Sequence, residues 1–222
     1  MTGPQPAGPP ASPPADSVAL RRRGLRLAWL IVVWDVIEGA VAITAGIAAG
    51  SIALIGFGLD STIEVFAASV VIWQLQGGSR ARARQAPALR LIAITFFVLA
   101  AYVSVESVRD LIGGDEAEGS IVGIVLNIVA LMVMVPVALA QARVGRALGN
   151  PVLVAQSKET WLSNYLSISL LVGLGLNEAL GLWWADPIVA LLIAAVAVNE
   201  GRETWESAGE AAEEVRTGRH DG

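Results

Sequence analysis

Cysteine is absent from the 222-residue chain, which excludes disulfide bonds, thiolate metal sites and cysteine nucleophiles. The one histidine, His220, lies close to the C-terminal end, so an imidazole ligand or proton relay inside a membrane is excluded as well. Any proton coupling must therefore use carboxylates. Charged residues are also scarce, at 16%, whereas 55% of the chain is hydrophobic, and this balance favours a membrane protein.

Six apolar runs account for this composition. They cover approximately 27–49, 50–75, 89–112, 120–141, 154–176 and 183–198. Each is long enough to approach or exceed the length of a membrane-spanning helix, and the first is longer than the apolar core of a signal peptide. The sequence therefore predicts an all-α, polytopic membrane protein with six transmembrane helices. It divides into a disordered leader (1–19), a six-helix domain (20–200) and a short acidic cytoplasmic tail (201–222).

The distribution of positive charge predicts the orientation. An even number of spans places both termini on the same side of the membrane. If that side is the cytoplasm, fourteen of the fifteen Lys and Arg residues lie there or at its boundary, and only Arg109 lies near the outer end. This asymmetry follows the positive-inside rule. We therefore expect an integral protein of the cytoplasmic (plasma) membrane with both termini inside.

The second run carries two acids close to its middle, Asp60 and Glu64. Its eleven Ile, Leu, Val and Phe residues between Ile52 and Trp73 contribute about −3 to −7 kcal/mol to insertion, and two central acids cost about 5 to 7. The run is thus close to neutral by itself, and something must neutralise its carboxylates. Because the spacing is i, i+4, both side chains lie on one helical face. A bound cation or proton is the expected partner.

A second acidic pair occurs in the first run. Asp35 and Glu38 are spaced i, i+3, and the predicted topology places Glu38 near the depth of Asp60 and Glu64. Several acids at one level resemble an oxygen-ligand cation site. The alternative is that each acid is protonated or paired with a neighbouring polar group.

The fifth run supplies a polar stripe. Thr160, Asn164 and Ser167 recur at intervals of four and three residues, with Ser163 adjoining, so one face of an otherwise apolar helix is polar. Their oxygens suit a cation shell, but such residues also serve as ordinary hydrogen-bonding contacts between membrane helices. Glu159, next to Lys158, is expected at the cytoplasmic interface, where the lysine can reach water.

Asp186 precedes Pro187 at the start of the sixth run. A carboxylate is favoured at a helix N-terminus, so capping is its expected role, with an outer cation vestibule as the alternative.

The stretch GSIALIGFGLDSTIEVFAASVVIWQL resembles the second membrane helix of the cation diffusion facilitator family. Asp60-xxx-Glu64 matches the family's pair of metal-ligating residues on that helix. Thr160-xxx-Asn164 is placed at the second pair, on the fifth helix, although both the usual His and the usual Asp are missing. WWADPIVALLIA is similar to the opening of the sixth helix, with Asp186 at its acidic position. The short tail is similar to the branch that lacks the C-terminal cytoplasmic domain.

This resemblance implies a six-helix exporter of divalent cations that is proton-coupled and homodimeric, here through membrane helices. Its substrates would be Zn²⁺ or a similar ion (Mn²⁺, Co²⁺ or Fe²⁺), with no permanently bound cofactor. The metal ligands would be Asp60, Glu64, Asn164, Thr160 and Glu38, followed by Ser163, Asp35 and Asp186. An all-oxygen shell by itself favours harder ions such as Mn²⁺ or Mg²⁺.

Two other classes of protein compete with a transporter. A non-transporting membrane scaffold or subunit would use its buried acids to bind a basic partner helix. An enzyme is disfavoured because the sequence has no HExxH motif, no cysteine, and no histidine placed to activate a serine. Nucleic-acid binding is not expected either, since the arginines flank apolar runs.

Overall fold

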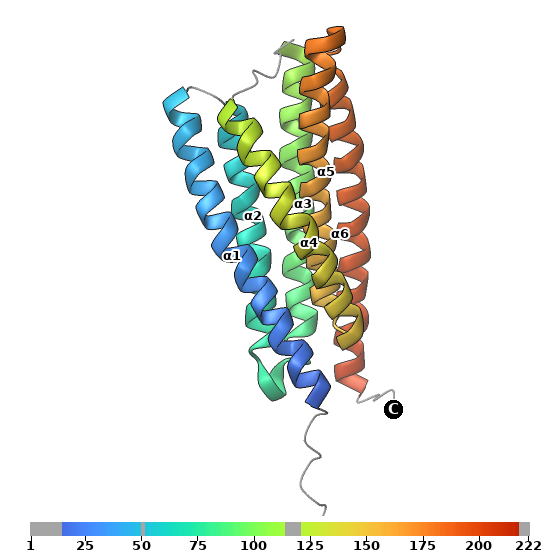
Figure 1. Ribbon diagram of the computed structural model, residues 1–222. Coiled ribbons are helices and arrows are strands. Elements are labelled where there is room, and N and C mark those ends of the chain that lie inside the picture. Colours follow the sequence, from blue (N-terminus) through green and yellow to red (C-terminus); the bar gives the residue numbers. More distant parts are fainter. Residues whose placement is uncertain (1–14, 50–51, 114–120, 218–222) are drawn as a thin grey trace, which may run out of the picture.

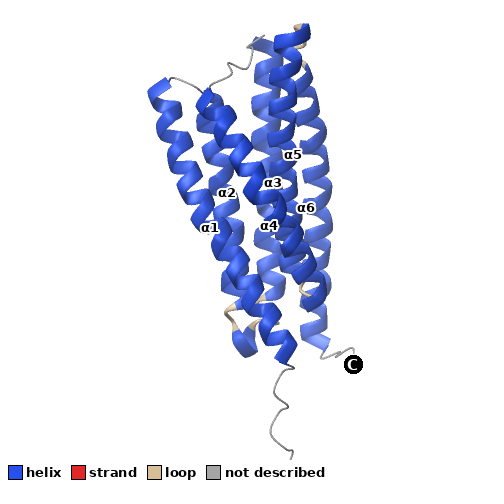
Figure 2. Cartoon of the chain, viewed as in Figure 1, coloured by secondary structure: helices blue, strands red, loops and turns tan. Residues whose placement is uncertain are grey.

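The computed structural model describes residues 15–49, 52–113 and 121–217, and within these ranges the chain is helical, without a strand (Figures 1 and 2). The long helices are α1 (Ala15–Ala49), α2 (Ile52–Leu75), α3 (Gln85–Gly113), α4 (Ile121–Leu148), α5 (Pro151–Leu180) and α6 (Ala185–Thr217), and a 3₁₀ turn, η1, covers Gly78–Arg80. The all-α prediction is confirmed.

Two helices, α1 and α6, extend farthest beyond the predicted runs. Residues 15–19, which the sequence assigns to the leader, form the first turn of α1, and α6 continues from the apolar run to Thr217 without a break. The extension of α6 is rich in Ala, Glu and Arg, which have high helix propensity, whereas residues 15–19 (ADSVA) contribute two alanines. The rest of the leader, the acidic loop after α3 and His220 lie outside the described residues.

Sequence signals fix the limits of α5, the helix that matters most for the site. The side chain of Asn150 accepts hydrogen bonds from the backbone amides of Val152 (3.0 Å) and Leu153 (3.2 Å), and Pro151 occupies the first helical position. At the other end Gly181 adopts φ 68°, the left-handed conformation that commonly stops a helix.

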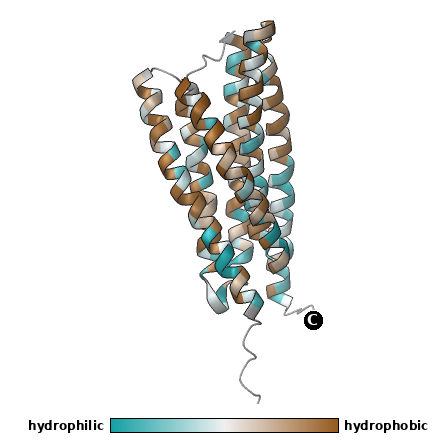
Figure 3. Ribbon diagram, viewed as in Figure 1, coloured by the Kyte–Doolittle hydropathy of each residue, from teal (hydrophilic) through white to brown (hydrophobic). Residues whose placement is uncertain are grey.

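The helices form one elongated bundle (Figure 1). α1 packs along α2, α3 packs along α6, and α4 crosses in front to contact both α1 and α5. Ala15 and Thr217, the first and last helical residues, lie at the same end of the bundle, which we call the basal end. Polar residues gather toward the basal end, while the remainder of the bundle is mainly apolar (Figure 3).

The outer surface of the bundle suits lipid. Large apolar side chains are exposed around it, including Val33 (56%), Met132 (73%) and Leu192 (64%). Four helices in the described part are long and apolar enough to cross a membrane, namely α1, α2, α3 and α4. The other two, α5 and α6, lie alongside them but carry a polar face and a charged second half, respectively. The chain is an integral membrane protein.

Candidate functional site

Close contact between α1 and α2 positions the first acids. A Cβ atom built on Gly58 would lie 3.0 Å from the carbonyl oxygen of Gly39 and 2.5 Å from Ile43. The two helices therefore touch backbone to backbone at a point between Glu38 and Asp60. Small residues at such a crossing allow membrane helices to approach closely.

Two hydrogen bonds at the basal end set the relative heights of the helices. Arg21 donates from Nε to the carbonyl oxygen of Leu75 (2.7 Å), and Asn150 donates from Nδ2 to Oε1 of Gln74 (3.0 Å). These contacts align α1 and α5 with the last turn of α2. Heights above this level can then be counted along each helix at about 1.5 Å per residue.

The acids occupy one layer of the bundle on this scale. Glu64 and Asp60 lie about 17 and 23 Å above Leu75, and Asp35 lies about 21 Å above Arg21. Asp35 interacts electrostatically with Glu38 and Asp60, and Glu64 interacts with all three. The structure thus brings together the acids predicted from the first and second runs.

Several oxygens of these carboxylates are enclosed without a hydrogen-bond partner. Asp35 is 1% exposed, with neither oxygen hydrogen-bonded, and Glu38 and Glu64 are also buried. Asp60 is only partly buried, but its Oδ1 is enclosed and has no hydrogen-bond partner, like Oε1 of Glu64. Among the described residues, no ion pair involves Asp35, Glu38, Asp60 or Glu64.

Glu159 belongs to the same cluster, contrary to its prediction as an interfacial residue. It is 1% exposed and interacts electrostatically with Asp60, Asp35 and Glu64. Thr95 of α3 faces it, but neither carboxylate oxygen forms a hydrogen bond of normal geometry. Its height, about 14 Å above Asn150, is close to that of Glu64. α5 therefore supplies a carboxylate that the sequence reasoning missed.

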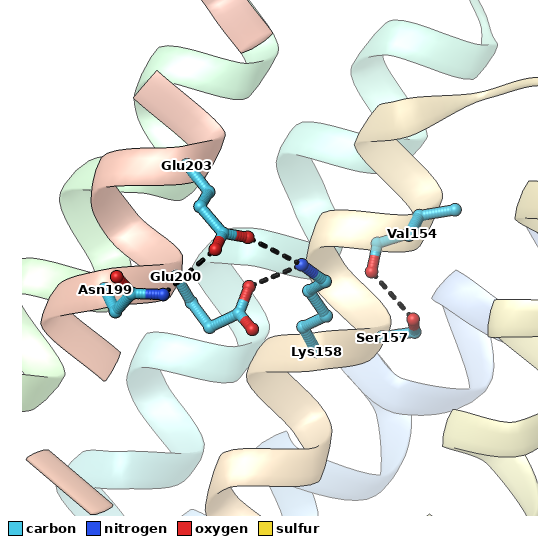
Figure 4. A network of polar contacts seen from close by, with 6 residues as sticks. All are labelled: Val154, Ser157, Lys158, Asn199, Glu200 and Glu203. Carbon is cyan, nitrogen blue, oxygen red and sulfur yellow. Dashed lines mark hydrogen bonds and ion pairs between the residues drawn. The ribbon is translucent and has the colours of Figure 1, made fainter. Parts of the chain in front are cut away.

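Lys158 explains the error. Successive residues on an α-helix point about 100° apart, so neighbours in sequence can face different surroundings. Lys158 faces α6, where its Nζ contacts Oε2 of Glu200 (2.5 Å) and of Glu203 (3.4 Å), as Figure 4 shows. The interfacial prediction was wrong for Glu159, and the structure shows Lys158 partly exposed and paired with acids of α6.

Three of the four residues in the predicted polar stripe of α5 face the interior, and Ser167 is only partly buried. Thr160, Ser163 and Asn164 are all buried, at 2%, 7% and 3% exposure. The hydroxyl of Ser163 faces Asp60 but forms no hydrogen bond of normal geometry. The i, i+4 pair adjacent to the acids thus includes Glu159 and Ser163, one position before the predicted pair of Thr160 and Asn164.

The carboxylates line one region of the bundle, but their oxygens do not converge on one position. In the described part of the chain, no three Asp, Glu or His side chains lie close enough together to hold one metal ion. A cation at this level would therefore need hydroxyl or amide oxygens of α5, or a small inward movement of the carboxylates, to complete its shell.

Asp186 lies apart from this cluster. It occupies the first turn of α6, as predicted, and its Oδ1 accepts a 2.7 Å hydrogen bond from the hydroxyl of Ser169. Ser169 is five residues beyond Asn164, or about 8 Å farther from the basal end. A Cβ atom built on Gly173 of α5 would lie 2.5 Å from the Cβ atom of Asp186. Asp186 therefore packs directly against the α5 backbone and joins α6 to α5.

Tyr102 of α3 packs over α2 one turn from Asp60. A Cβ atom on Gly56 would lie 2.0 Å from its hydroxyl oxygen but 3.4 Å from the ring carbon Cζ. We expect Gly56→Ala to destabilise the protein by about 1–3 kcal/mol through overpacking. Adding Tyr102→Phe removes the clashing oxygen, so the double variant should recover most of that loss.

Unfolding of the purified protein in detergent measures both effects. Gly175→Ala is the matched control, because an added Cβ there meets no atom within 4 Å. If the double variant is as unstable as Gly56→Ala, the proposed contact does not limit packing at Gly56.

The features on α1, α2 and α5 define a class: a helical membrane protein with a buried, unpaired cluster of carboxylates. Residues 90–210, just over half of the chain, match the cation efflux transmembrane domain family. The chain belongs to this family. The matched region includes Glu159 and Asn164, whereas Asp60 and Glu64 precede it.

A curated relative is described as an uncharacterized transporter of Synechocystis sp. It is 27% identical over 162 residues, which cover 69% of this chain and 51% of the relative. The chain thus spans about half the length of that curated relative.

Proposed function

We propose that this protein transports divalent metal cations out of the cytoplasm, and that the cation binds among the carboxylates of α1, α2 and α5. The observation that carries the proposal is the set of buried acids from three helices, of which Asp35 and Glu159 have no hydrogen-bonded carboxylate oxygen. Family membership gives independent support.

Charge balance favours a cation as the cargo. An ionised carboxylate in a low-dielectric interior costs several kcal/mol unless a positive charge or hydrogen-bond donors compensate it. Among the described residues, no Arg or Lys forms an ion pair with a carboxylate of the cluster. A mobile divalent ion, alternating with protons, can compensate several acids in turn.

The ligands in this proposal are oxygens. Asp60 and Glu64 of α2 and Glu159 of α5 form the charged part, and Asn164 and Ser163 contribute neutral oxygens. Thr160, Glu38 and Asp35 complete the polar wall. The cargo is Zn²⁺ or a similar ion such as Mn²⁺, Co²⁺ or Fe²⁺, because these ions accept carboxylate and amide ligands.

The proposed topology has six spans with both termini in the cytoplasm. Exposed apolar residues on α5 (Ile168, Val172) and on the first half of α6 (Ile188, Leu192) support two spans beyond the four most apolar helices. The start of α1 and the end of α6 both lie at the basal end, where polar residues gather (Figure 3). This end would face the cytoplasm under the positive-inside rule.

Transport by this scheme alternates between two arrangements of the bundle. The cation enters from the basal side and displaces protons from the carboxylates, and external protons later return to them as the cation leaves. Cation binding shifts the equilibrium between the two arrangements only by the difference in its affinity for them. The working unit is proposed to be a homodimer joined through membrane helices, with no permanently bound cofactor.

Purified protein in proteoliposomes tests the proposal. Uptake is measured against a panel of Zn²⁺, Mn²⁺, Co²⁺, Fe²⁺ and Mg²⁺, with and without a pH gradient. At least one transition-metal ion should be transported, faster when the gradient drives protons in the opposite direction. Absence of transport and of binding across the whole panel would contradict the proposal and favour a membrane scaffold.

A further inference from the structure

We propose that Gln141 of α4 and Gln156 of α5 form a second, transient station for the cation, on the basal side of the carboxylates. This inference rests on the proposed function, because it assigns a step to the same cargo. The two residues are 0% and 1% exposed, and Nε2 of Gln141 donates a 2.8 Å hydrogen bond to Oε1 of Gln156.

The pair retains unused polar groups. Oε1 of Gln141 and Nε2 of Gln156 are both buried without a hydrogen-bond partner. Turning both amides by 180° exchanges their roles, so in either state one oxygen and one amino group remain free. An amide oxygen is a suitable ligand for a partly hydrated cation, and the amino group can hold a water molecule beside it.

Its position links the carboxylates to the basal end. Gln156 precedes Glu159, Thr160 and Ser163 by three, four and seven residues, so all four lie on one face of α5. It lies about 5 Å below Glu159 and about 9 Å above Asn150. A cation moving along this face would meet the amides before the carboxylates.

Polar groups continue below the pair. Asn150 donates to Gln74, and Nε2 of Gln74 donates to the carbonyl oxygen of Ala81 (3.1 Å), in the segment between α2 and α3. Apolar side chains flank the pair, with Val137 and Val144 on α4 and Leu153 on α5, all buried. The amides thus form a polar step within an apolar layer of the bundle.

Ordinary interhelical hydrogen bonding is the competing explanation, since buried amides commonly join membrane helices. The two explanations differ in what they predict for kinetics. A purely structural pair affects folding and leaves transport by the folded protein unchanged. A station on the route affects the rate of transport more than the equilibrium affinity of the carboxylates.

Gln141→Leu and Gln156→Leu test this difference, because leucine has a similar size and no polar atoms. Zn²⁺ binding to the purified variants and Zn²⁺ uptake by proteoliposomes are measured together, with the best-transported ion of the panel replacing Zn²⁺ if Zn²⁺ is not carried. We expect equilibrium affinity within about threefold of wild type and a maximal rate at least about tenfold lower. An unchanged rate, or a loss of affinity equal to the loss of rate, would overturn the proposal.

Thiol labelling gives a second measurement, which the cysteine-free chain makes simple. A small cationic thiol reagent should modify Gln156→Cys, and saturating cation should slow the reaction. Leu153→Cys is the matched control, one turn away on the same helix and equally buried among apolar side chains. Equal lack of reaction at both positions would overturn the station. If wild type neither binds nor transports any cation, the proposed function and this inference both fail.

Discussion

Asp60→Asn is expected to lower metal-dependent transport in proteoliposomes by at least about 100-fold while leaving the protein folded. The amide has nearly the same shape as the carboxylate but lacks its negative charge, so it binds a divalent cation much more weakly. Asp60 is central to the cluster, since it interacts electrostatically with Asp35, Glu64 and Glu159. Measured uptake of the transported ion gives the result.

The control for this variant is Asp186→Asn. Asp186 is an acid of the same bundle, but it is hydrogen-bonded to Ser169 and lies outside the cluster. Its variant should transport within about threefold of wild type. Cation should also raise the unfolding temperature of wild type and of Asp186→Asn, through binding to the folded state, but not that of Asp60→Asn. Normal transport by Asp60→Asn would remove Asp60 from the proposed site.

Glu159→Gln is expected to lower both cation affinity and transport by about 10- to 100-fold. Glu159 is the one carboxylate of α5 in the cluster, and it lies at nearly the same height as Glu64. Without it the cation would have only neutral oxygens on the α5 side. Equilibrium binding and initial rates of uptake should therefore fall together.

The neighbouring substitution Lys158→Gln is the matched control. It removes a partly exposed ion pair with Glu200 and Glu203, whose contribution to stability is about 1 kcal/mol or less. Cation affinity should remain unchanged. If Lys158→Gln impairs binding as strongly as Glu159→Gln, the effect comes from disturbance of α5 and not from loss of a ligand.

The sequence could predict the acids of α1 and α2 because they interrupt apolar runs. In such a run a charge is costly, and the i, i+3 and i, i+4 spacings determine which side chains share a face. The argument from a costly charge in an apolar run failed for Glu159, because this residue follows a lysine close to the start of the fifth run. Two adjacent opposite charges are typical of an interface, and only the packing of α5 between α2 and α6 separates their directions.

Helix limits were less predictable than helix positions. Apolar runs mark the part of a helix that contacts lipid or core, but helical hydrogen bonding continues wherever residue propensity permits. Ala15 and Thr217 lie well beyond the runs for this reason. The amides of Gln141 and Gln156 were also overlooked, because their pairing joins residues of two different helices.

The length of α6 has a mechanical consequence. Its 33 residues extend about 50 Å, whereas the hydrocarbon layer is about 30 Å thick. In the proposed topology, about 20 Å of this helix therefore projects from the bilayer. Arg82 contacts Glu214 on this projecting part at 3.6 Å, and Lys158 holds α5 to the same helix farther along. Displacement of this part of α6 would therefore be transmitted to α5 at Lys158, one residue from Glu159.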